Sequence, residues 1–137
     1  MITLQQFITA GNATFTISNS KTGNRLTFRV KQPKREEIKG LRFVQVMTGP
    51  DNESSYTNLG TIFPDGRYFR SRKSRIGEDA LSAKTFAFLW KYVDSIGKLP
   101  TIEIRYSNNC GRCGRKLTVP SSIDNRIGPE CAKHFHI

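Results

Sequence analysis

The three cysteines of this chain all lie in its last quarter, and their spacing with a nearby histidine is typical of a zinc site. Cys110 and Cys113 form a CxxC pair, and Cys131 and His134 form a CxxH pair after seventeen intervening residues. Three thiolates and one imidazole are the ligands of a four-coordinate tetrahedral zinc site. Because the protein would supply all four ligands, no position would remain open for a substrate. The sequence therefore predicts one Zn²⁺ ion with a structural role.

Two alternatives concern these residues. His136 is a second candidate for the fourth ligand, but on a continuing helix it would lie about 140° around the axis from Cys131, whereas His134 would lie about 60° away. The thiols could instead be free or joined in a disulfide, because CxxC also occurs in redox motifs. Redox motifs do not need a third cysteine that is followed by a histidine, which favours the metal.

Glycine and proline residues in this segment predict how the backbone presents the ligands. Gly114 follows the CxxC pair, where a tight turn favours a positive φ that a side chain would resist. Gly128 and Pro129 are typical of a helix start, with proline in the first turn. We expect a knuckle, a short hairpin over residues 115–127 and a helix that supplies the last two ligands. Together these would form a treble-clef-like zinc module.

The chain is strongly basic, with 22 Lys and Arg against 11 Asp and Glu and a formal net charge of +11. Three thiolates on one Zn²⁺ would change this charge by about −1, so the positive field would survive metal binding. The cations gather in residues 67–75, in residues 31–42 and around the predicted zinc site. Such clusters favour polyanionic partners.

Residues 67–75 combine five cations with two aromatic residues, a mixture that predicts nucleic-acid binding. Lys and Arg neutralise phosphates while aromatic faces stack on unpaired bases, which suits RNA or single-stranded DNA. Tyr68 is the candidate for stacking, although Tyr68 and Phe69 could instead alternate into and out of a sheet. The residues predicted to bind nucleic acid or a protein partner are Arg67, Tyr68, Arg70, Arg72, Lys73, Arg75, Arg112, Arg115 and Lys116.

The part of the chain before the cysteines has the pattern of an α+β domain. Runs of alternating polar and apolar residues, bounded by turn residues, predict antiparallel strands. We expect an antiparallel sheet of about five strands, and a further run leads directly into Cys110. The runs cover residues 13–18, 25–31, 41–48, 56–63, 67–70 and 101–105.

One long helix is predicted after the fifth run. Ser82 is a favourable N-cap, and Leu81 and Phe86 have the spacing of a hydrophobic staple. Gly97 and then Pro100 mark the end of the helix. Apolar residues at helical spacing predict a stripe that packs on the sheet, with an aromatic groove for a partner as the alternative. This stripe consists of Phe86, Leu89, Trp90, Val93 and Ile96.

No low-complexity linker separates the two parts of the chain. We expect one compact unit, in which an α+β domain (residues 1–106) carries a docked zinc-binding module (residues 107–137). No run approaches the roughly 20 apolar residues that a membrane span needs, and residues 1–7 lack the features of a signal peptide. Together with the odd number of cysteines, this predicts a cytoplasmic protein without a membrane partner, and we expect a monomer.

Catalytic constellations are mostly absent. Both histidines lie in the tail, so a Ser-His-Asp or Cys-His arrangement would dismantle the zinc site. Neither a GxxxxGK[ST] nor a GxGxxG phosphate loop occurs, and the H-x-E motif of zinc deaminases is missing. We expect no enzymatic activity. A zinc-supported nuclease that uses His136 as its spare histidine is the remaining enzymatic alternative.

The tail, with its CGRCGRxLT and IGPECA motifs, resembles the C-terminal motif of an uncharacterised family of bacteriophage and prophage proteins. The resemblance rests on residues 110–123 and 126–132, and a looser similarity covers residues 43–52 and 59–63. Many sequences of that family end near the third cysteine, and this chain departs from them in the fourth ligand. The resemblance implies a phage origin, a bacterial host cell and a metal-bound tail, and it carries no function.

Two non-enzymatic functions are compatible with these features. In the first, the protein is an accessory protein that binds nucleic acid with little sequence readout, so that its affinity falls steeply as salt rises. In the second, it is a counter-defence protein, similar in logic to anti-CRISPR inhibitors, that binds a host effector nuclease and blocks loading or cleavage of nucleic acid. The second function would centre on a compact patch with an apolar anchor.

Overall fold

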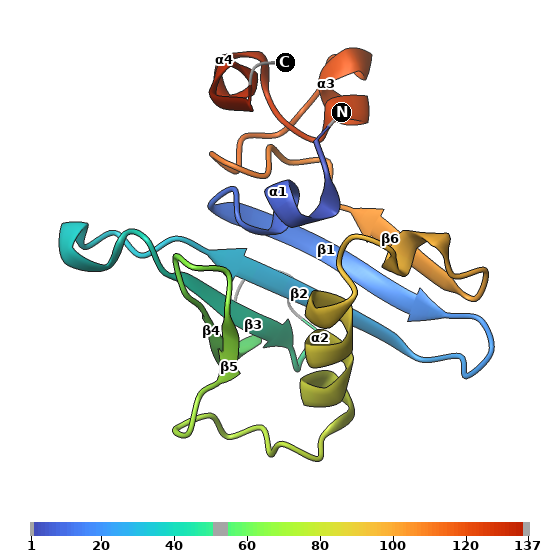
Figure 1. Cartoon of the computed structure of the whole chain (residues 1–137). Helices are drawn as coiled ribbons and strands as arrows, with labels where there is room; N and C mark the ends of the chain where they lie inside the picture. The colour runs from blue at the N-terminus through green and yellow to red at the C-terminus, as the bar shows by residue number, and fades with distance from the viewer. Residues whose placement is uncertain (1, 51–54, 136–137) are drawn as a thin grey trace.

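A computed structural model, which describes residues 2–50 and 55–135, has an α+β fold built on one six-stranded antiparallel sheet (Figure 1). The strand order is β5-β4-β3-β2-β1-β6, so the first five strands form a meander and the last strand lies beside the first. The strands are β1 (Asn12–Asn19), β2 (Arg25–Lys31), β3 (Arg42–Met47), β4 (Tyr56–Ile62), β5 (Tyr68–Arg70) and β6 (Ile102–Tyr106).

The fold class and the antiparallel sheet expected from the sequence are confirmed, but the sheet has six strands rather than about five. The additional strand is the alternating run before the cysteines, which pairs with β1 from Phe15↔Tyr106 to Asn19↔Ile102. The alternation of this run predicts a strand, but its partner depends on how the chain returns to the sheet. This pairing matters because it places the cysteine segment directly beyond one edge of the sheet.

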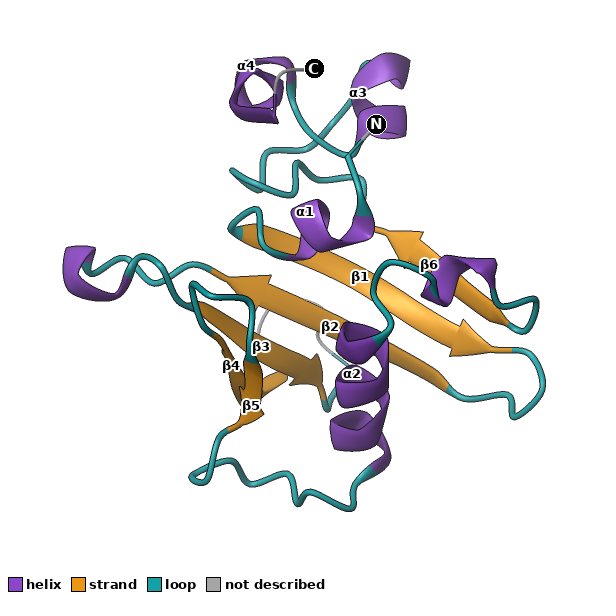
Figure 2. Ribbon diagram, viewed as in Figure 1, coloured by secondary structure: helices purple, strands orange, loops and turns teal. Residues whose placement is uncertain are grey.

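The helices are short. Figure 2 shows α1 and α2 on the same face of the sheet, while α3 and α4 lie beyond one end of it. None of the helices within residues 2–50 and 55–135 has the length and apolar character needed to cross a membrane. The helices are α1 (Leu4–Ile8), α2 (Leu81–Lys91), α3 (Pro120–Asn125) and α4 (Pro129–Ala132), with the 3-10 turns η1 (Glu36–Ile38), η2 (Ile96–Lys98) and η3 (Lys133–Phe135).

The prediction of one long helix is wrong in its start and its length. α2 has 11 residues and follows Ala80, so Ser82 lies within the first turn instead of capping it. Leu81 is the first helical residue and is 49% exposed, outside the position that a hydrophobic staple requires. Tyr92 leaves the helical conformation with φ −113° and ψ 29°, and tight turns then carry the chain to Ile96 in η2.

The apolar stripe is nevertheless part of the core, as predicted. The Phe86 ring lies 5.3 Å from that of Phe28 on β2 and 4.8 Å from that of Tyr68 on β5, measured between ring centroids. The Trp90 indole N–H donates a hydrogen bond of 2.8 Å to the carbonyl of Gly66, which ties α2 to the turn between β4 and β5. Because these rings are packed together, the stripe itself does not form an exposed aromatic groove.

The two faces of the sheet differ in how far they are covered by helices. In β1, Ala13, Phe15 and Ile17 are buried under the helices, whereas the residues between them are only partly buried. In the described part of the chain no helix covers the opposite face, which points away from the viewer in Figure 2. We call this surface the open face. By strand register it carries Thr14, Thr16 and Ser18 of β1, Arg25, Thr27, Arg29 and Lys31 of β2, Gln45 and Met47 of β3, Tyr56 and Asn58 of β4, and Glu103 and Arg105 of β6.

Candidate metal centre

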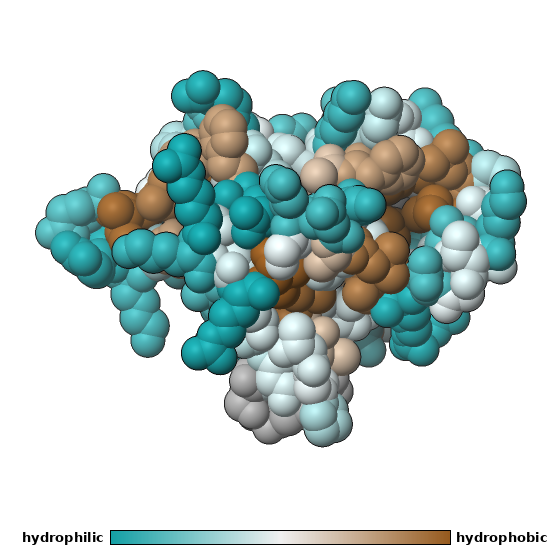
Figure 3. All heavy atoms as spheres, turned by 90° about the horizontal axis from the view of Figure 1, so that it is seen from below, coloured by the Kyte–Doolittle hydropathy of each residue, from teal (hydrophilic) through white to brown (hydrophobic). Residues whose placement is uncertain are grey.

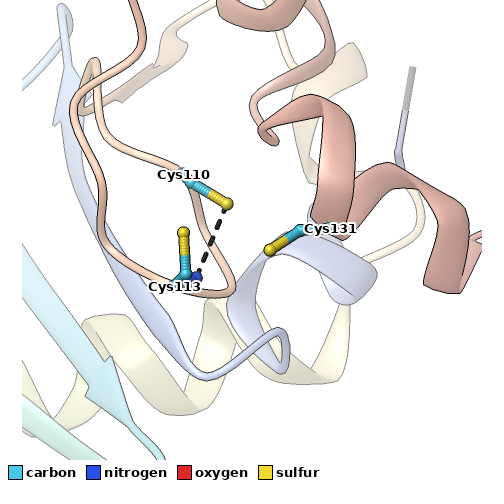
Figure 4. A group of neighbouring side chains, drawn as sticks. All are labelled: Cys110, Cys113 and Cys131. Atoms are coloured by element: carbon cyan, nitrogen blue, oxygen red, sulfur yellow. Dashed lines mark hydrogen bonds between the residues drawn. The ribbon is translucent and has the colours of Figure 1, made fainter.

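The structure brings the three cysteine sulfurs together, with all Sγ atoms within 4.8 Å of one another. Figure 4 shows Cys110 and Cys113 on one loop and Cys131 opposite them, with the three sulfurs facing a common centre. A tetrahedral zinc ion with Zn–S bonds of about 2.3 Å would separate its sulfur ligands by roughly 3.8 Å. The cysteines are unlinked, and a small contraction would bring the sulfurs to that spacing. The three residues therefore fit a metal ion.

A tight turn presents the first two sulfurs. The Gly114 N–H donates to the Cys110 carbonyl at 2.8 Å, and Gly114 has φ +80°, the positive value expected from the sequence. The Cys113 N–H donates to the Cys110 Sγ at 3.5 Å. On either side of the turn, the Cys110 N–H donates to the Arg115 carbonyl at 2.8 Å. The knuckle is thus held by its own backbone.

The third sulfur comes from α4, which begins where the sequence predicted a helix start. Gly128 is the N-cap and Pro129 the first helical residue. The hairpin expected over residues 115–127 is wrong: its middle is the helix α3, and strand-like pairing is limited to the bridge between Asn109 and Lys116. Pro120 explains the difference, because its fixed φ and missing N–H suit the first turn of a helix and not a paired strand.

The fourth ligand is not part of the sulfur cluster. His134 lies in the 3-10 turn η3 and is exposed, and its ring nitrogens do not join the three sulfurs in the described structure. His136, the rival candidate, lies outside the described residues. The role of His134 as a metal ligand stays a prediction.

The environment of Cys110 favours its thiolate. Burial acts to raise the pKa of this thiol, but the N–H groups of Cys113, Gly128 and Arg112 outweigh it and lower the pKa to about 7. Burial raises the pKa of Cys131, against the opposing effect of the Arg112 guanidinium, whose Nη1 lies 3.5 Å from the Cys131 Sγ. Metal ions bind thiolates, so the lowered pKa prepares Cys110 to bind one near neutral pH.

The cysteine segment is attached to the sheet by backbone contacts. The Asn12 N–H donates to the Gly111 carbonyl at 2.7 Å, and the Asn12 side-chain amide donates to the Arg112 carbonyl at 2.9 Å. A Cβ at Gly111 would lie 2.7 Å from the Phe7 ring, so a side chain there would displace α1 or the knuckle. The Arg126 guanidinium lies 3.6 Å from the centre of the Tyr106 ring. The division at residue 106 is a prediction that no observation tests.

Comparison with known families gives one match, which lies in the tail. Residues 104–136 match the model of a family of unknown function, DUF6011. The matched segment includes all three cysteines together with α3 and α4. No curated protein and no solved structure matches the chain. Because the matched family has no known activity, the function has to be inferred from the surface and the chemistry of the residues.

The residues of the predicted basic segment 67–75 lie in different environments in the structure. Tyr68, expected to stack on bases, packs instead on Phe86, and burial raises the pKa of its hydroxyl to about 12. Tyr68 follows the alternation of a strand, which was the alternative prediction. Its ring packs against the core, while the neighbouring Phe69 points outward and is 53% exposed. Arg70 donates from Nη1 to the carbonyls of Ser71 and Ile76, both at 3.0 Å, so it holds the following loop. Arg67 pairs with Asp65 at 2.6 Å.

The remaining predicted cations are exposed. Arg72, Lys73 and Arg75 lie on the loop after β5, and Arg115 and Lys116 lie beside the knuckle. None of these five forms an ion pair with a carboxylate in the described part of the chain. Arg112 is also exposed, but its guanidinium contacts Cys131.

A further group of cations was missed in the sequence. Arg25 and Arg29 lie on the open face of β2, and Arg105 lies on the open face of β6. The signal was present, since Arg25 and Arg29 alternate with the apolar Leu26, Phe28 and Val30. Period-two alternation puts such residues on one face of a strand. They are separated in sequence from residues 67–75 and so form no run.

Proposed function

We propose that this is a small, non-enzymatic zinc-binding protein that binds nucleic acid. The observation that carries this proposal is the excess of cations over carboxylates. The chain has 22 Lys and Arg against 11 Asp and Glu, and Arg72, Lys73, Arg75, Arg115 and Lys116 are exposed in the structure. An uncompensated positive surface attracts polyanions and accelerates their association.

Zinc is the metal that suits the cysteine cluster. Three thiolates form a soft ligand set, which zinc accepts readily in a tetrahedral geometry. His134 is the proposed fourth ligand, because it lies in the turn η3 that directly follows α4, the helix that carries Cys131. With four protein ligands, the ion would stabilise the tail in a treble-clef-like arrangement and leave no site for a substrate.

A binding assay against several polymers tests the nucleic-acid part of the proposal. Protein with its zinc content determined by elemental analysis is titrated against labelled RNA, single-stranded DNA and duplex DNA of matched length. Binding whose affinity falls steeply as salt rises supports the proposal. The absence of binding to all three polymers at low salt contradicts it.

A second candidate function, inhibition of a host effector nuclease, is favoured by one apolar groove. The groove, of about 280 Å³, lies between α2 and the end of the β1–β2 hairpin and is lined by Ile17, Leu26, Leu81, Phe88 and Ile102. Leu81 and Phe88 are 49% and 44% exposed, and Figure 3 shows hydrophobic side chains gathered on this side of the molecule. Such a patch could anchor a protein partner.

This second function has a direct assay. A purified host defence nuclease is tested for cleavage with and without excess protein. If the groove is the anchor, Leu81→Ser with Phe88→Ser relieves the inhibition, whereas Phe69→Ser, which removes a 53% exposed aromatic residue of β5 outside the groove lining, does not. A nuclease whose cleavage is unchanged at saturating protein is not the target. Both functions are proposed for a protein of phage origin.

A further inference from the structure

The open face of the sheet is largely polar across five strands, with Phe43 and Met47 of β3 as its apolar members. One row of residues crosses it from Tyr56 on β4 through Met47, Thr27 and Thr16 to Arg105 on β6. Four strand spacings of about 4.8 Å make this row roughly 19 Å long, enough for several nucleotides of an extended chain. A shallow groove of about 570 Å³ lies along the row.

The charge on this surface is mostly positive. Arg25, Arg29, Lys31 and Arg105 lie on the open face, and among the described residues the one carboxylate in register with them is Glu103, which pairs with Arg105 at 2.7 Å. Burial, and then the charges of Arg29 and Lys34, lower the pKa of Lys31, as expected where cations crowd together. The surface therefore complements a polyanion.

An ordered stacking group lies at one end of the row. The Arg29 guanidinium lies over the Tyr56 ring, 3.9 Å from its centre. Arg29 Nε donates to Gln45 Oε1 at 2.9 Å, and Gln45 Nε2 donates in turn to Asn58 Oδ1 at 3.0 Å. Planar groups held in this way are pre-organised for stacking on a base and for contact with phosphate.

The basic loop after β5 continues this surface. Lys73 and Arg75 line a hollow of about 260 Å³ together with Tyr56 and Asn58. The Ser74 hydroxyl donates to the Asn58 carbonyl at 2.6 Å and so fixes the loop against β4. Arg29 of β2 and the loop residues Lys73 and Arg75 are far apart in the sequence, but all three lie close to Tyr56.

We propose that the open face binds single-stranded RNA, an inference that rests on the proposed nucleic-acid binding. The strand is single because Tyr56 can stack only on a base that is not enclosed in a duplex. RNA is favoured because the groove is lined by hydroxyl and amide groups, which can pair with a 2′-hydroxyl that DNA lacks. These groups belong to Thr14 and Asn109, and to Thr16 and Thr27, whose hydroxyls share one hydrogen bond of 2.7 Å with each other. The cations contact phosphates, and little base sequence is read.

The test compares matched pairs of variants in binding to an oligouridylate and to the DNA oligomer of the same length. R25Q with R105Q removes two exposed cations from the open face, and K84Q with K91Q removes two exposed cations from α2 on the opposite side. The first pair should weaken RNA binding about tenfold and reduce the salt slope by about 1.4, at roughly 0.7 per phosphate contact. The second pair should leave the slope unchanged.

A second comparison isolates stacking. Tyr56→Ala should weaken RNA binding roughly tenfold with the salt slope retained, because stacking on a base is lost while the phosphate contacts remain. Tyr92→Ala, which removes an aromatic residue that is 43% exposed and lies outside this face, should bind as the wild type does. Thermal unfolding of each variant checks that the fold is retained.

Each outcome decides a different point. If R25Q/R105Q and K84Q/K91Q lose affinity equally, or if neither loses any, the open face is not the binding site. If the DNA oligomer binds as tightly as the RNA, the assignment to RNA is wrong. If the wild-type protein binds no nucleic acid of any kind, the proposed function itself fails.

Discussion

At the scale of single residues, the metal centre depends on three sulfurs that the chain brings together from two segments. Cys110 and Cys131 are buried, whereas Cys113 is exposed at the tip of the turn. Loss of Cys110 or Cys131 leaves the other buried thiol without the metal that would satisfy it. Substitution of a buried cysteine is therefore expected to lower the stability of the whole tail as well as its affinity for zinc.

Replacement of Cys110 by Ser is expected to abolish stoichiometric zinc binding and to destabilise the tail, because metal binding and local folding are coupled. The measurement is zinc content by elemental analysis together with limited proteolysis of residues 107–137. Arg115→Gln, at an exposed position beside the knuckle, serves as the control and should retain the zinc. If Cys110→Ser retains one zinc ion at wild-type affinity, the assignment of this ligand is wrong.

Replacement of His134 by Ala is expected to weaken zinc binding by roughly 100-fold or more, because the fourth protein ligand is then missing. His136→Ala should leave the affinity unchanged. Competition with a chromophoric chelator measures both affinities. A strong effect of His136→Ala with none of His134→Ala would reverse the assignment.

The pKa of Cys110 predicts a pH dependence in the zinc-free protein. A folded-state pKa of about 7, below the ordinary 9.0, means that folding favours the thiolate. This stabilising contribution is complete above pH 9 and is lost as the pH falls through 7. The raised pKa of Cys131 acts oppositely, but its contribution is lost only at higher pH. The unfolding midpoint of the zinc-free protein should therefore rise from pH 7 to pH 9, and Cys110→Ser should remove that rise.

At the scale of elements, the sequence predicts the strands better than the helices. Alternation in residues 25–31 and 56–63 places β2 and β4 to within a residue or so, because strand pairing then buries one face. The end of α2 could not be found in this way, since Val93 and Ile96 continue the apolar spacing although the backbone has already turned. Tertiary packing of these side chains, and not helix formation, explains their spacing.

The candidate metal centre could be predicted from the sequence, but the contacts on the open face could not, because they depend on tertiary structure. The cysteines are near in sequence and carry a spacing rule, so their convergence could be predicted. Arg29 and Tyr56 come from different strands, and their stacking depends on the register of β2 against β3 and of β3 against β4. Long-range register of this kind leaves no local motif in the sequence.

The aromatic centre of the core gives a prediction for α2. Phe86→Ala is expected to destabilise the protein by about 3–5 kcal/mol, because Phe86 is fully buried between Phe28, Tyr68 and Trp90. Phe88→Ala, the same change two residues further along, should cost less than about 1 kcal/mol, because this ring is 44% exposed. Chemical denaturation measures both. Equal losses would mean that α2 packs on the sheet by a different face.

At the scale of the whole molecule, the chain combines a sheet covered on one face with a cysteine-rich tail beyond its end. The helices and the tail leave the open face uncovered in the described structure (Figure 1). The net charge of +11 is distributed so that this face and the loop after β5 are both basic. Electrostatic attraction across such a surface is sensitive to ionic strength, because a bound polyanion releases its counterions.

The most direct measurement is the salt dependence of binding of the zinc-loaded wild-type protein to a labelled single-stranded RNA. About six phosphate contacts, from the cations of the open face and the adjoining loop, would give a slope of about −4 in log affinity against log salt. A linear dependence near that slope is the expected result. No binding at low salt, or an affinity that does not change with salt, would contradict the proposal that this protein binds nucleic acid.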